Sequence, residues 1–461
     1  MIRDILSSAL RAALVEVGVE PPAEIHLERP GRREHGDWSS NVALATSKQH
    51  GRKPRDLAGE LVAALNASPA RHVERAEVAG PGFVNFHLHD TWLHDVLGDV
   101  LDGGEDGYAR PDLGHGLRVD VEFVSANPTG PLHAGGGRWA AYGDALCNIL
   151  ERCGHVVHRE YYLNDRGVQM ELFGASLAAR KAGAELPEDG YKGEYIVEWA
   201  AEMPDDADPA EWGYERVKRD LAASLAGIGV VFDTWFSERS LVGSGAIDAT
   251  LADLRERGAA FDADGAVWLR TTDYGDDKDR VLVKSDGDPT YLLPDIAYHR
   301  DKHLRGHQLL IDIWGADHHG YMARLQAGMQ ALGHAPEELE IILGQLVSLV
   351  RGGQEVRLSK RSGEIVLLDD LVEAVGPDVA RLTFLLQSLD TRQTIDLDLI
   401  TAQSNENPVF YVQYANARIH SIGRKVAEAG VVRAPFAEAD LALLIHEREL
   451  DLLRKLSELP E

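Results

Sequence analysis

Cysteine is scarce in this sequence of 461 residues, which contains two, Cys147 and Cys153. Two thiols six residues apart provide neither a disulfide framework nor a zinc site, and they are typical of a reducing compartment. We therefore expect buried structural thiols and a cytoplasmic protein. Long apolar runs are also lacking, because none approaches the ~20 residues of a membrane-spanning helix. The N-terminal residues 1–18 mix acids with apolar residues at helical spacing, which indicates an amphipathic helix and not a secretion signal.

Positive charge is the third scarcity. The sequence has 47 Lys and Arg against 75 Asp and Glu, a formal net charge of −28. Taken alone, this balance argues against a polyanionic partner, and a nucleic-acid-binding protein of this composition would need a local basic face. Solubility and acid-rich pockets for a cationic substrate are both adequate explanations. The length and the ordinary hydrophobic content of 44% predict a globular protein of two to four domains.

The most informative stretch is residues 118–151. Residues 118–124 are typical of a half-buried strand, residues 125–137 are rich in turn formers, and helical spacing begins at Arg138. A strand, a glycine-rich turn and a helix start direct backbone N–H groups and the helix dipole at one point, which suits a phosphate. Gly135, Gly136 and Gly137 have no Cβ, so a ligand could lie against the backbone. A glycine-rich connection without a ligand accounts for the spacing equally well.

Further strands are predicted at 266–270, 279–285 and 340–350, and within 156–167 and 307–320, where each strand runs into a loop; helical segments alternate with them. This alternation predicts an α/β fold with a doubly wound parallel sheet. Residues 183–260, which are acidic and contain several prolines, are interpreted as an insertion without chemistry of its own. Ligands bind such sheets at the carboxyl ends of the strands. The turns at 133–137, 315–320 and 357–363 each follow a strand, so we expect them to converge on one crevice.

The ends of the chain have a different character. Residues 1–88 are predicted to form a small α/β domain, with helices near 2–14, 41–49 and from Pro54, a strand-like segment at 25–30, and one strand over 73–88 bent at 80–82. Residues 89–117 form a connector, and residues 376–461 are mainly helical. We expect five leucines near the C-terminus to lack a bundle that buries them: Leu441, Leu444, Leu450, Leu453 and Leu456.

Two motifs resemble those of a known family. The run VEFVSANPTGPLHAGGGR resembles the HIGH region of arginyl-tRNA synthetases, with Gly136 in place of the second histidine, and RLSKRSG resembles their KMSKS loop. The resemblance implies a Rossmann-like, HUP-type class I catalytic domain at 118–375 that uses ATP with Mg²⁺. It implies catalytic roles for His133, Gly136 and Lys360, and ATP contacts from Gly135, Gly137, Asp317, His318, Ser359 and Arg361.

A guanidinium substrate requires carboxylates in a fork-like arrangement. The candidates are Glu122, Asn127, Tyr291 and Asp295, the last two being i,i+4 in one helix. Glu122 could equally be an outward-facing strand carboxylate, and Asp295 an acid at a helix N-terminus. The resemblance implies that these four residues bind arginine. It also implies two sets of tRNA contacts. In an N-terminal additional domain that touches the D-loop, the contacts are Arg32, Arg33 and Trp38. In the C-terminal helices, they are Tyr411, Tyr414 and Asn416. A solvated loop with one packed Trp is the alternative for the first group.

The implied function is arginine–tRNA ligation. L-Arginine and ATP would form arginyl-adenylate, which is transferred to the 2′-hydroxyl of the terminal adenosine of tRNA(Arg). The implied protein is a monomer that binds no DNA and no membrane. The family's C-terminal anticodon-binding domain is expected to be cut short at Glu461, by truncation or in a shortened paralogue. A paralogue that charges another acceptor, or a non-catalytic tRNA-binding relative, would share these motifs.

A metal-dependent phosphoesterase is the main competing hypothesis. The adjacent residues Asp317, His318 and His319 could ligate a divalent metal, as in DHH-type phosphoesterases. That fold needs several further Asp/His motifs, and the remaining histidines do not form such a set. We therefore expect no tightly bound protein metal.

Overall fold

The computed structural model describes residues 2–356, 366–402, 407–432 and 434–460. The chain divides into two compact units, Met1–Arg110 with Val431–Glu461, and Pro111–Gly430. Each unit has its own hydrophobic core. Among the residues in these ranges, no helix combines the length and the apolar character that crossing a bilayer requires.

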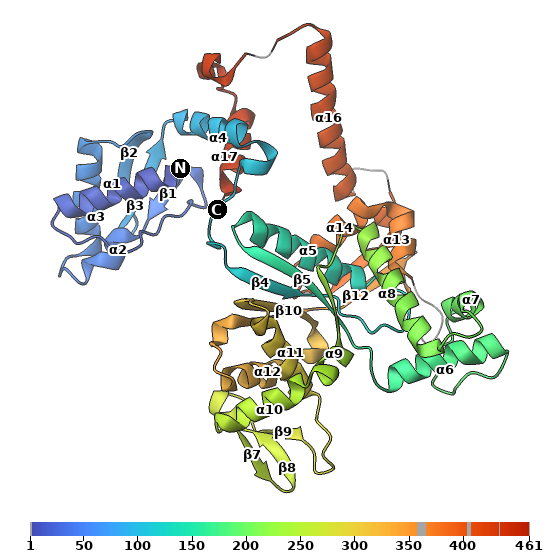
Figure 1. Cartoon of the computed structure of the whole chain (residues 1–461). Coiled ribbons are helices and arrows are strands. Elements are labelled where there is room, and N and C mark those ends of the chain that lie inside the picture. Colours follow the sequence, from blue (N-terminus) through green and yellow to red (C-terminus); the bar gives the residue numbers. More distant parts are fainter. Residues whose placement is uncertain (1, 357–365, 403–406, 433, 461) are drawn as a thin grey trace. The chain divides into compact units, whose positions relative to one another are not determined.

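The first unit contains an antiparallel sheet in the order β1–β3–β2 (Figure 1). Its elements are α1 (Ile2–Glu16), β1 (Trp38–Ser40), α2 (Val42–Ser47), α3 (Pro54–Ala67), β2 (Val73–Ala79), β3 (Phe83–Leu88), α4 (Thr91–Gly107) and α17 (Glu447–Glu458). The bent strand expected over 73–88 is instead a hairpin, because Gly80 and Gly82 both adopt positive φ and reverse the chain. The predicted strand at 25–30 is reduced to a single bridge between Glu28 and Ser39.

The last helix of the chain completes the core of this first unit. Leu450 and Leu453 of α17 are 7% and 5% exposed, and Leu456 packs against the same cluster. The Tyr108 hydroxyl donates a hydrogen bond to the Leu456 carbonyl at 2.7 Å, and Arg454 donates one to Asp90 at 2.9 Å. The prediction that these three leucines lack a partner was therefore wrong. The amphipathic pattern identified a buried face but not the distant segment, α4 and the N-terminal core, that covers it.

The second unit is built on a five-stranded sheet in the order β11–β10–β4–β5–β6. The strands are β4 (Arg118–Glu122), β5 (Val156–Leu163), β6 (Thr234–Ser237), β10 (Leu309–Gly315) and β11 (Leu339–Gly344), and every neighbouring pair is parallel. Helix α5 (Gly136–Arg152) packs on one face, and α11 (Leu292–Leu304) and α12 (His319–Ala331) lie on the other (Figure 1). The predicted doubly wound parallel α/β fold is confirmed. The chain order reverses between β4 and β10, where such sheets bind ligands.

Two parts of the predicted sheet were assigned incorrectly. Strand β6 lies inside the proposed insertion 183–260 but pairs with β5 along Glu160–Leu163, so this range is not wholly an insertion. The predicted strands at 266–270 and 279–285 do form, as β8 (Ala266–Leu269) and β9 (Arg280–Val283). They join β7 (Ala260–Ala263) in a separate antiparallel sheet. Strand propensity cannot specify which edge a strand pairs with, because pairing depends on partners far away in sequence.

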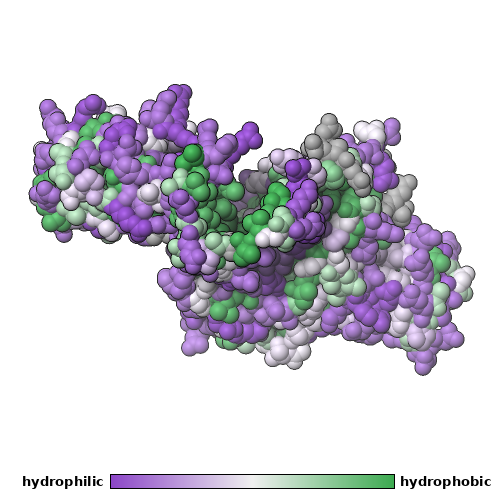
Figure 2. Space-filling view, turned by 90° about the horizontal axis from the view of Figure 1, so that it is seen from above, coloured by the Kyte–Doolittle hydropathy of each residue, from purple (hydrophilic) through white to green (hydrophobic). Residues whose placement is uncertain are grey.

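The remaining elements surround this frame. They are α6 (Val168–Ala182), α7 (Glu194–Glu202), α8 (Pro209–Gly227), α9 (Glu238–Ser244), α10 (Ala246–Glu256), β12 (Val347–Arg351), β13 (Gln354–Val356), α13 (Leu368–Val375), α14 (Pro377–Leu385), β14 (Gln393–Asp396), α15 (Leu397–Ile400) and α16 (Pro408–Glu428). Helix α16 begins at Pro408 as predicted, and the Asn407 side chain accepts a hydrogen bond from Val409 N at 3.1 Å. Hydrophilic side chains cover most of the face in Figure 2, as a composition with 26% charged residues predicts.

Candidate active site

A cavity of about 260 Å³ lies at the carboxyl ends of β4, β5 and β10. Glu122 is the last residue of β4, Tyr162 lies near the end of β5, and Gly315 ends β10. Helix α5 contributes Trp139 and α12 contributes Tyr321, while α11 supplies Asp295, Tyr298 and His299. The cavity therefore occupies the point where the strand order reverses. It combines carboxylates with aromatic walls, as a site for a cation with an apolar stem would.

Asp295 is the carboxylate of this cavity that has the least charge compensation. It lies in the first turn of α11, one turn after Tyr291, and accepts a hydrogen bond from the Tyr321 hydroxyl. Burial raises the pKa of Asp295 to about 6, although the Tyr321 hydrogen bond and His299 act in the opposite direction. Its side chain reaches the cavity while protein surrounds its other sides. A cationic ligand at this position would relieve the cost of an ionised, buried carboxylate.

Glu122 belongs to a charged layer between the sheet and α11. Lys302 Nζ, which is fully buried, lies 2.7 Å from Glu122 Oε2 and 3.0 Å from Asp312 Oδ1. Tyr298 Oη lies 2.8 Å from Glu122 Oε2 and 2.7 Å from Glu160 Oε1, so its single proton is shared between them. Although burial opposes the charge, these carboxylates hold the pKa of Lys302 well above its usual value. The floor of the cavity is thus set by an ion-pair network and cannot rearrange without exposing a buried charge.

His299 adds a second cation to this layer. Its Nε2 lies 2.6 Å from Asp312 Oδ2 and its Nδ1 lies 2.7 Å from the Asp295 carbonyl oxygen. Both ring nitrogens face acceptors, so both act as donors and the ring is an imidazolium. Burial alone would lower the pKa of His299, but Asp312 raises it above the usual value. His299 connects the backbone at Asp295 to the sheet and fixes the position of the first turn of α11.

The predicted nucleotide turn sits at the start of α5. Gly136 N donates a hydrogen bond to His133 Nδ1 at 3.0 Å, so a neutral His133 ring carries its proton on Nε2, where it can act as a donor. The segment that follows the RLSKRSG loop is joined to this turn. Ala134 N donates to the Val366 carbonyl, and Leu368 N donates to the Leu132 carbonyl, both at 2.9 Å. Val366 and Leu368, more than 200 residues after the His133 turn in sequence, therefore pair with it.

The glycines of this turn have a packing role that the sequence interpretation missed. A Cβ on Gly136 would lie 2.6 Å from Leu132 Cδ1, and one on Gly137 would lie 2.7 Å from Leu368 Cδ1 and from Phe384 Cε2. We expected the missing Cβ atoms of these two glycines to leave room for a ligand. For both, that space is filled by hydrophobic side chains of the core. Gly137 allows α5 to approach α13 and α14 closely, and Gly136 allows α5 to pack on Leu132 of the preceding turn.

The structure places the other predicted site residues as follows. His318 lines the cavity, whereas Asp317 is largely exposed, packs against Gly315 and pairs with His318 at 3.5 Å. Tyr291 does not line the cavity and is 87% exposed, so its arginine contact stays a prediction. Tyr291 is the N-cap of α11, and its carbonyl oxygen accepts a hydrogen bond from Asp295 N at 3.2 Å, so the backbone spacing is helical although the two side chains differ in exposure. Asn127 also lies outside the cavity lining and donates a hydrogen bond to Gln169 Oε1 at 2.8 Å. Ser359, Lys360 and Arg361 lie outside the described residues.

Of the predicted tRNA contacts, Trp38 needs correction. It is 1% exposed in the core of the first unit, and the Arg29 guanidinium lies 4.6 Å from its ring centroid. A base cannot stack on it, because the strand position of Trp38 turns the ring inward. Arg32 is exposed and pairs with Glu34, while the partly exposed Arg33 pairs with Asp451 of α17. The α16 residues predicted to contact tRNA are exposed, namely Tyr411, Tyr414 and Asn416.

Several site residues escaped the sequence interpretation. Tyr298, His299 and Lys302 are three of them, and with the predicted Asp295 they form a polar stripe at i, i+3, i+4 and i+7 on α11. This spacing was available in the sequence and could have identified the buried face. Trp139, Tyr162 and Tyr321 gave no comparable signal, because an aromatic residue that lines a ligand cavity has the same pattern as one in a core.

Of the two cysteines, Cys147 is buried as expected, and burial raises the pKa of its thiol to about 12.

Comparisons with known proteins agree with this geometry. Residues 103–188 and 231–392 match the family model "tRNA synthetases class I (R), catalytic domain", and residues 1–88 match "Arginyl tRNA synthetase N terminal domain". The chain is similar over its whole length to arginine–tRNA ligases of Frankia alni (47% identity) and Halalkalibacterium halodurans (44% identity), and covers 85% of each. In fold it resembles the arginyl-tRNA synthetase of Thermus thermophilus, with 22% identity, a TM-score of 0.70, and coverage of 100% of this chain and 89% of that one.

The parallel sheet, the His133 turn and the cavity at the strand ends are those of a class I aminoacyl-tRNA synthetase. The similarity to the two ligases extends over the entire chain, beyond the catalytic fold. The chain belongs to the arginyl-tRNA synthetase family, the arginine–tRNA ligases. The metal-dependent phosphoesterase hypothesis is therefore set aside.

Proposed function

We propose that the cavity at the ends of β4 and β10 binds L-arginine, with Asp295 facing its cationic end. The observation that carries this proposal is the ionisable, half-buried Asp295 carboxyl beside Tyr321, which has no cation bound directly to it among the described residues. Glu122 is a second carboxylate at the cavity, although Lys302 already compensates part of its charge. A guanidinium donates several hydrogen bonds from one plane, and Tyr162, Tyr298 and Trp314 are suited to pack along its apolar stem.

ATP is proposed to bind between the His133 turn and the loop at 357–363. His133 and the backbone of Gly135–Gly137 would orient the phosphates, and His318 would lie near the adenosine. Lys360, with Ser359 and Arg361, would stabilise the charge on the departing pyrophosphate. The hydrogen bonds that join Ala134 to Val366 and Leu132 to Leu368 support this proposal, because Val366 and Leu368 follow the motif closely in sequence. Mg²⁺ would arrive with the ATP phosphates, and we assign no protein ligands to it.

The arginine carboxylate would then attack the α-phosphate, and the 2′-hydroxyl of the terminal adenosine of tRNA(Arg) would take up the arginyl group. Catalysis of this kind relies on positioning and charge stabilisation, and no side chain needs to form a covalent bond. We propose that tRNA contacts exposed residues of α16, namely Tyr411, Tyr414 and Asn416, and the exposed Arg32 and Arg33. Asn127 and Tyr291 are proposed as outer arginine contacts. Asp317 is proposed as an ATP contact. We further propose that the protein is cytoplasmic and monomeric. Sedimentation equilibrium would test the monomeric state.

The test measures arginine-dependent ATP–pyrophosphate exchange and attachment of labelled arginine to tRNA. Exchange and charging specific to arginine are expected in the parent chain, and adenylate formation without tRNA charging would identify the alternative acceptor. Lys360→Ala should lose about 2.7–4 kcal/mol of transition-state stabilisation, a rate loss of roughly 100-fold to 1,000-fold. Glu340→Gln, an exposed carboxylate on β11, is the matched control. If Lys360→Ala activates arginine at the parent rate, its role is refuted.

A further inference from the structure

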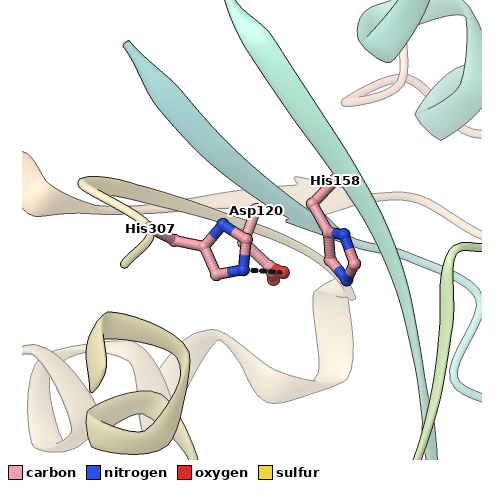
Figure 3. Close-up of side chains that lie close together, drawn as sticks. All are labelled: Asp120, His158 and His307. Atoms are coloured by element: carbon pink, nitrogen blue, oxygen red, sulfur yellow. Dashed lines mark ion pairs between the residues drawn. The ribbon is translucent and has the colours of Figure 1, made fainter. Parts of the chain in front are cut away.

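A second cluster of chemically active side chains lies at the opposite end of the sheet from the arginine cavity. Asp120 is the central residue of β4 and pairs in register with His158 on β5, while His307 precedes β10. The three side chains point toward one another from these three segments (Figure 3). His307 Nε2 lies 3.7 Å from Asp120 Oδ2, and one ligand atom from each residue lies within 4.8 Å of the other two. Nothing in the proposed reaction uses these groups.

Asp120 is the carboxylate of the layer under α11 that lacks hydrogen bonds. Its side chain is fully buried, and within the described part of the chain neither carboxylate oxygen accepts a hydrogen bond. Lys302 Nζ lies 3.3 Å from Oδ1, but its shorter contacts go to Glu122 and Asp312. The other three carboxylates of the layer are each hydrogen-bonded to a cation: Glu122 and Asp312 to Lys302, and Glu160 to Arg305. A buried, incompletely compensated carboxylate is costly unless a further positive charge binds it.

The two histidines are placed to offer ring nitrogens to an ion. His307 is 5% exposed, and among the described residues its Nδ1 has no hydrogen-bond partner, while its Nε2 faces Asp120. His158 is half-buried, its Nδ1 lies 3.9 Å from Asp233, and its ring centroid is 5.0 Å from that of His307. His158 Nε2 lies 3.0 Å from Thr234 Oγ1 and 3.7 Å from Glu160 Oε2, contacts that a bound ion would replace. Its partial exposure provides a route from solvent.

We propose that Asp120, His158 and His307 form a binding site for a divalent transition-metal ion of the zinc class. Zinc takes histidine nitrogen and carboxylate oxygen at about 2.0–2.2 Å, which places neighbouring ligand atoms of a tetrahedron about 3.3–3.6 Å apart. The 3.7 Å separation between His307 and Asp120 already approaches this value. Rotation of the half-buried His158 ring would bring in the third ligand, and solvent would supply the fourth. This proposal replaces our expectation from sequence that the protein binds no metal tightly.

Such an ion would be structural. It would connect β4 and β5 to the segment between α11 and β10, and it would compensate Asp120. Mg²⁺ would not substitute for it, because Mg²⁺ prefers oxygen ligands in an octahedral arrangement. A second group of possible ligands, His303, His334 and Glu338, lies nearby. It is less suitable, because His334 Nδ1 already pairs with Glu338 at 2.8 Å and His303 Nδ1 with the His307 carbonyl oxygen at 2.9 Å.

The test uses the full chain without an affinity tag, stripped with a chelator and dialysed against Zn²⁺ or Co²⁺. Elemental analysis should find about one zinc ion per chain, Co²⁺ should give the visible spectrum of a tetrahedral site, and Zn²⁺ should raise the melting temperature. His158→Gln should weaken Zn²⁺ binding at least about tenfold and abolish the rise in melting temperature. His158 is half-buried, so this variant should fold, and circular dichroism checks this. Asp120→Asn provides a second ligand variant, and His334→Gln is the matched control that should retain the ion.

Two results would overturn the proposal. In the first, the stripped parent chain takes up no Zn²⁺ and its melting temperature does not respond to the ion. In the second, zinc binds but is lost in His334→Gln and retained in both His158→Gln and Asp120→Asn, which would assign it to the other cluster. Neither result depends on aminoacylation activity.

Discussion

Replacing Asp295 by Asn should make the protein more stable and a poorer binder of arginine. The folded-state pKa of Asp295 is about 6, against 3.8 for an unhindered Asp, a difference of about 2 units. Because the folded pKa is raised, this group favours the folded state fully below pH 3.8, and that contribution is lost as the pH rises through about 6. At pH 8 the ionised carboxylate therefore destabilises the fold by at most ~3 kcal/mol. Its opening onto the cavity lets water screen the charge, which makes the expected gain in Asp295→Asn smaller, about 1–2 kcal/mol.

The assay is urea unfolding of the parent and Asp295→Asn at pH 8 and at pH 5, with Glu340→Gln as the exposed control. The variant should gain stability at pH 8, the gain should shrink at pH 5, and the control should show neither effect. Calorimetric titration with arginine should show a loss of about 2–5 kcal/mol for Asp295→Asn, which is roughly 30-fold or more in Kd. Citrulline, which has the same length without the charge, should be discriminated against less strongly.

The parent chain should also bind arginine more weakly as the pH falls through about 6, because Asp295 takes up a proton in the free protein. Asp295→Asn should lose this pH dependence. An unchanged arginine Kd in the variant would refute the placement of Asp295 in the arginine site. Equal stability of parent and variant at pH 8 would refute the desolvation argument separately.

Three substitutions test the packing and the charged layer through urea unfolding. Lys302→Met should cost about 3–5 kcal/mol, because it leaves buried carboxylates without their cation, and a loss under about 1 kcal/mol would contradict the network. Gly137→Ala should destabilise the fold by about 1–3 kcal/mol, because the added methyl group would overpack against Leu368 and Phe384. Gly423→Ala, in open space on α16, should be neutral or stabilising. Equal effects of the two would argue against the close contact at Gly137. Leu453→Ala should lower the free energy of unfolding of the first unit by about 2–5 kcal/mol. Leu452→Ala, at an exposed position, should lower it little. Equal effects of the two would contradict the packing of α17 on the N-terminal core.

The sequence by itself determined the order of elements and the chemistry of the nucleotide turn. Hydrophobic periodicity and turn residues are local signals, so they predicted α5 after the glycine-rich turn, the start of α16 at Pro408 and the parallel sheet. The family motifs specified His133 and the carboxylates Glu122 and Asp295 as residues to examine. The predictions of α5, α16 and the sheet class were confirmed because each depends on backbone preferences or residue types within short stretches of sequence, whereas the roles of the three site residues stay predictions.

Tertiary structure decided which predicted groups share an environment. It buried Trp38, left Tyr291 exposed, moved β6 into the main sheet and covered the α17 leucines with a segment more than 300 residues away in sequence. It also brought Asp120 of β4 and His307, which precedes β10, together, a contact that no local pattern encodes. Burial and pairing depend on which surfaces meet after the chain has folded. The raised pKa of Asp295 could therefore come only from the assembled cavity.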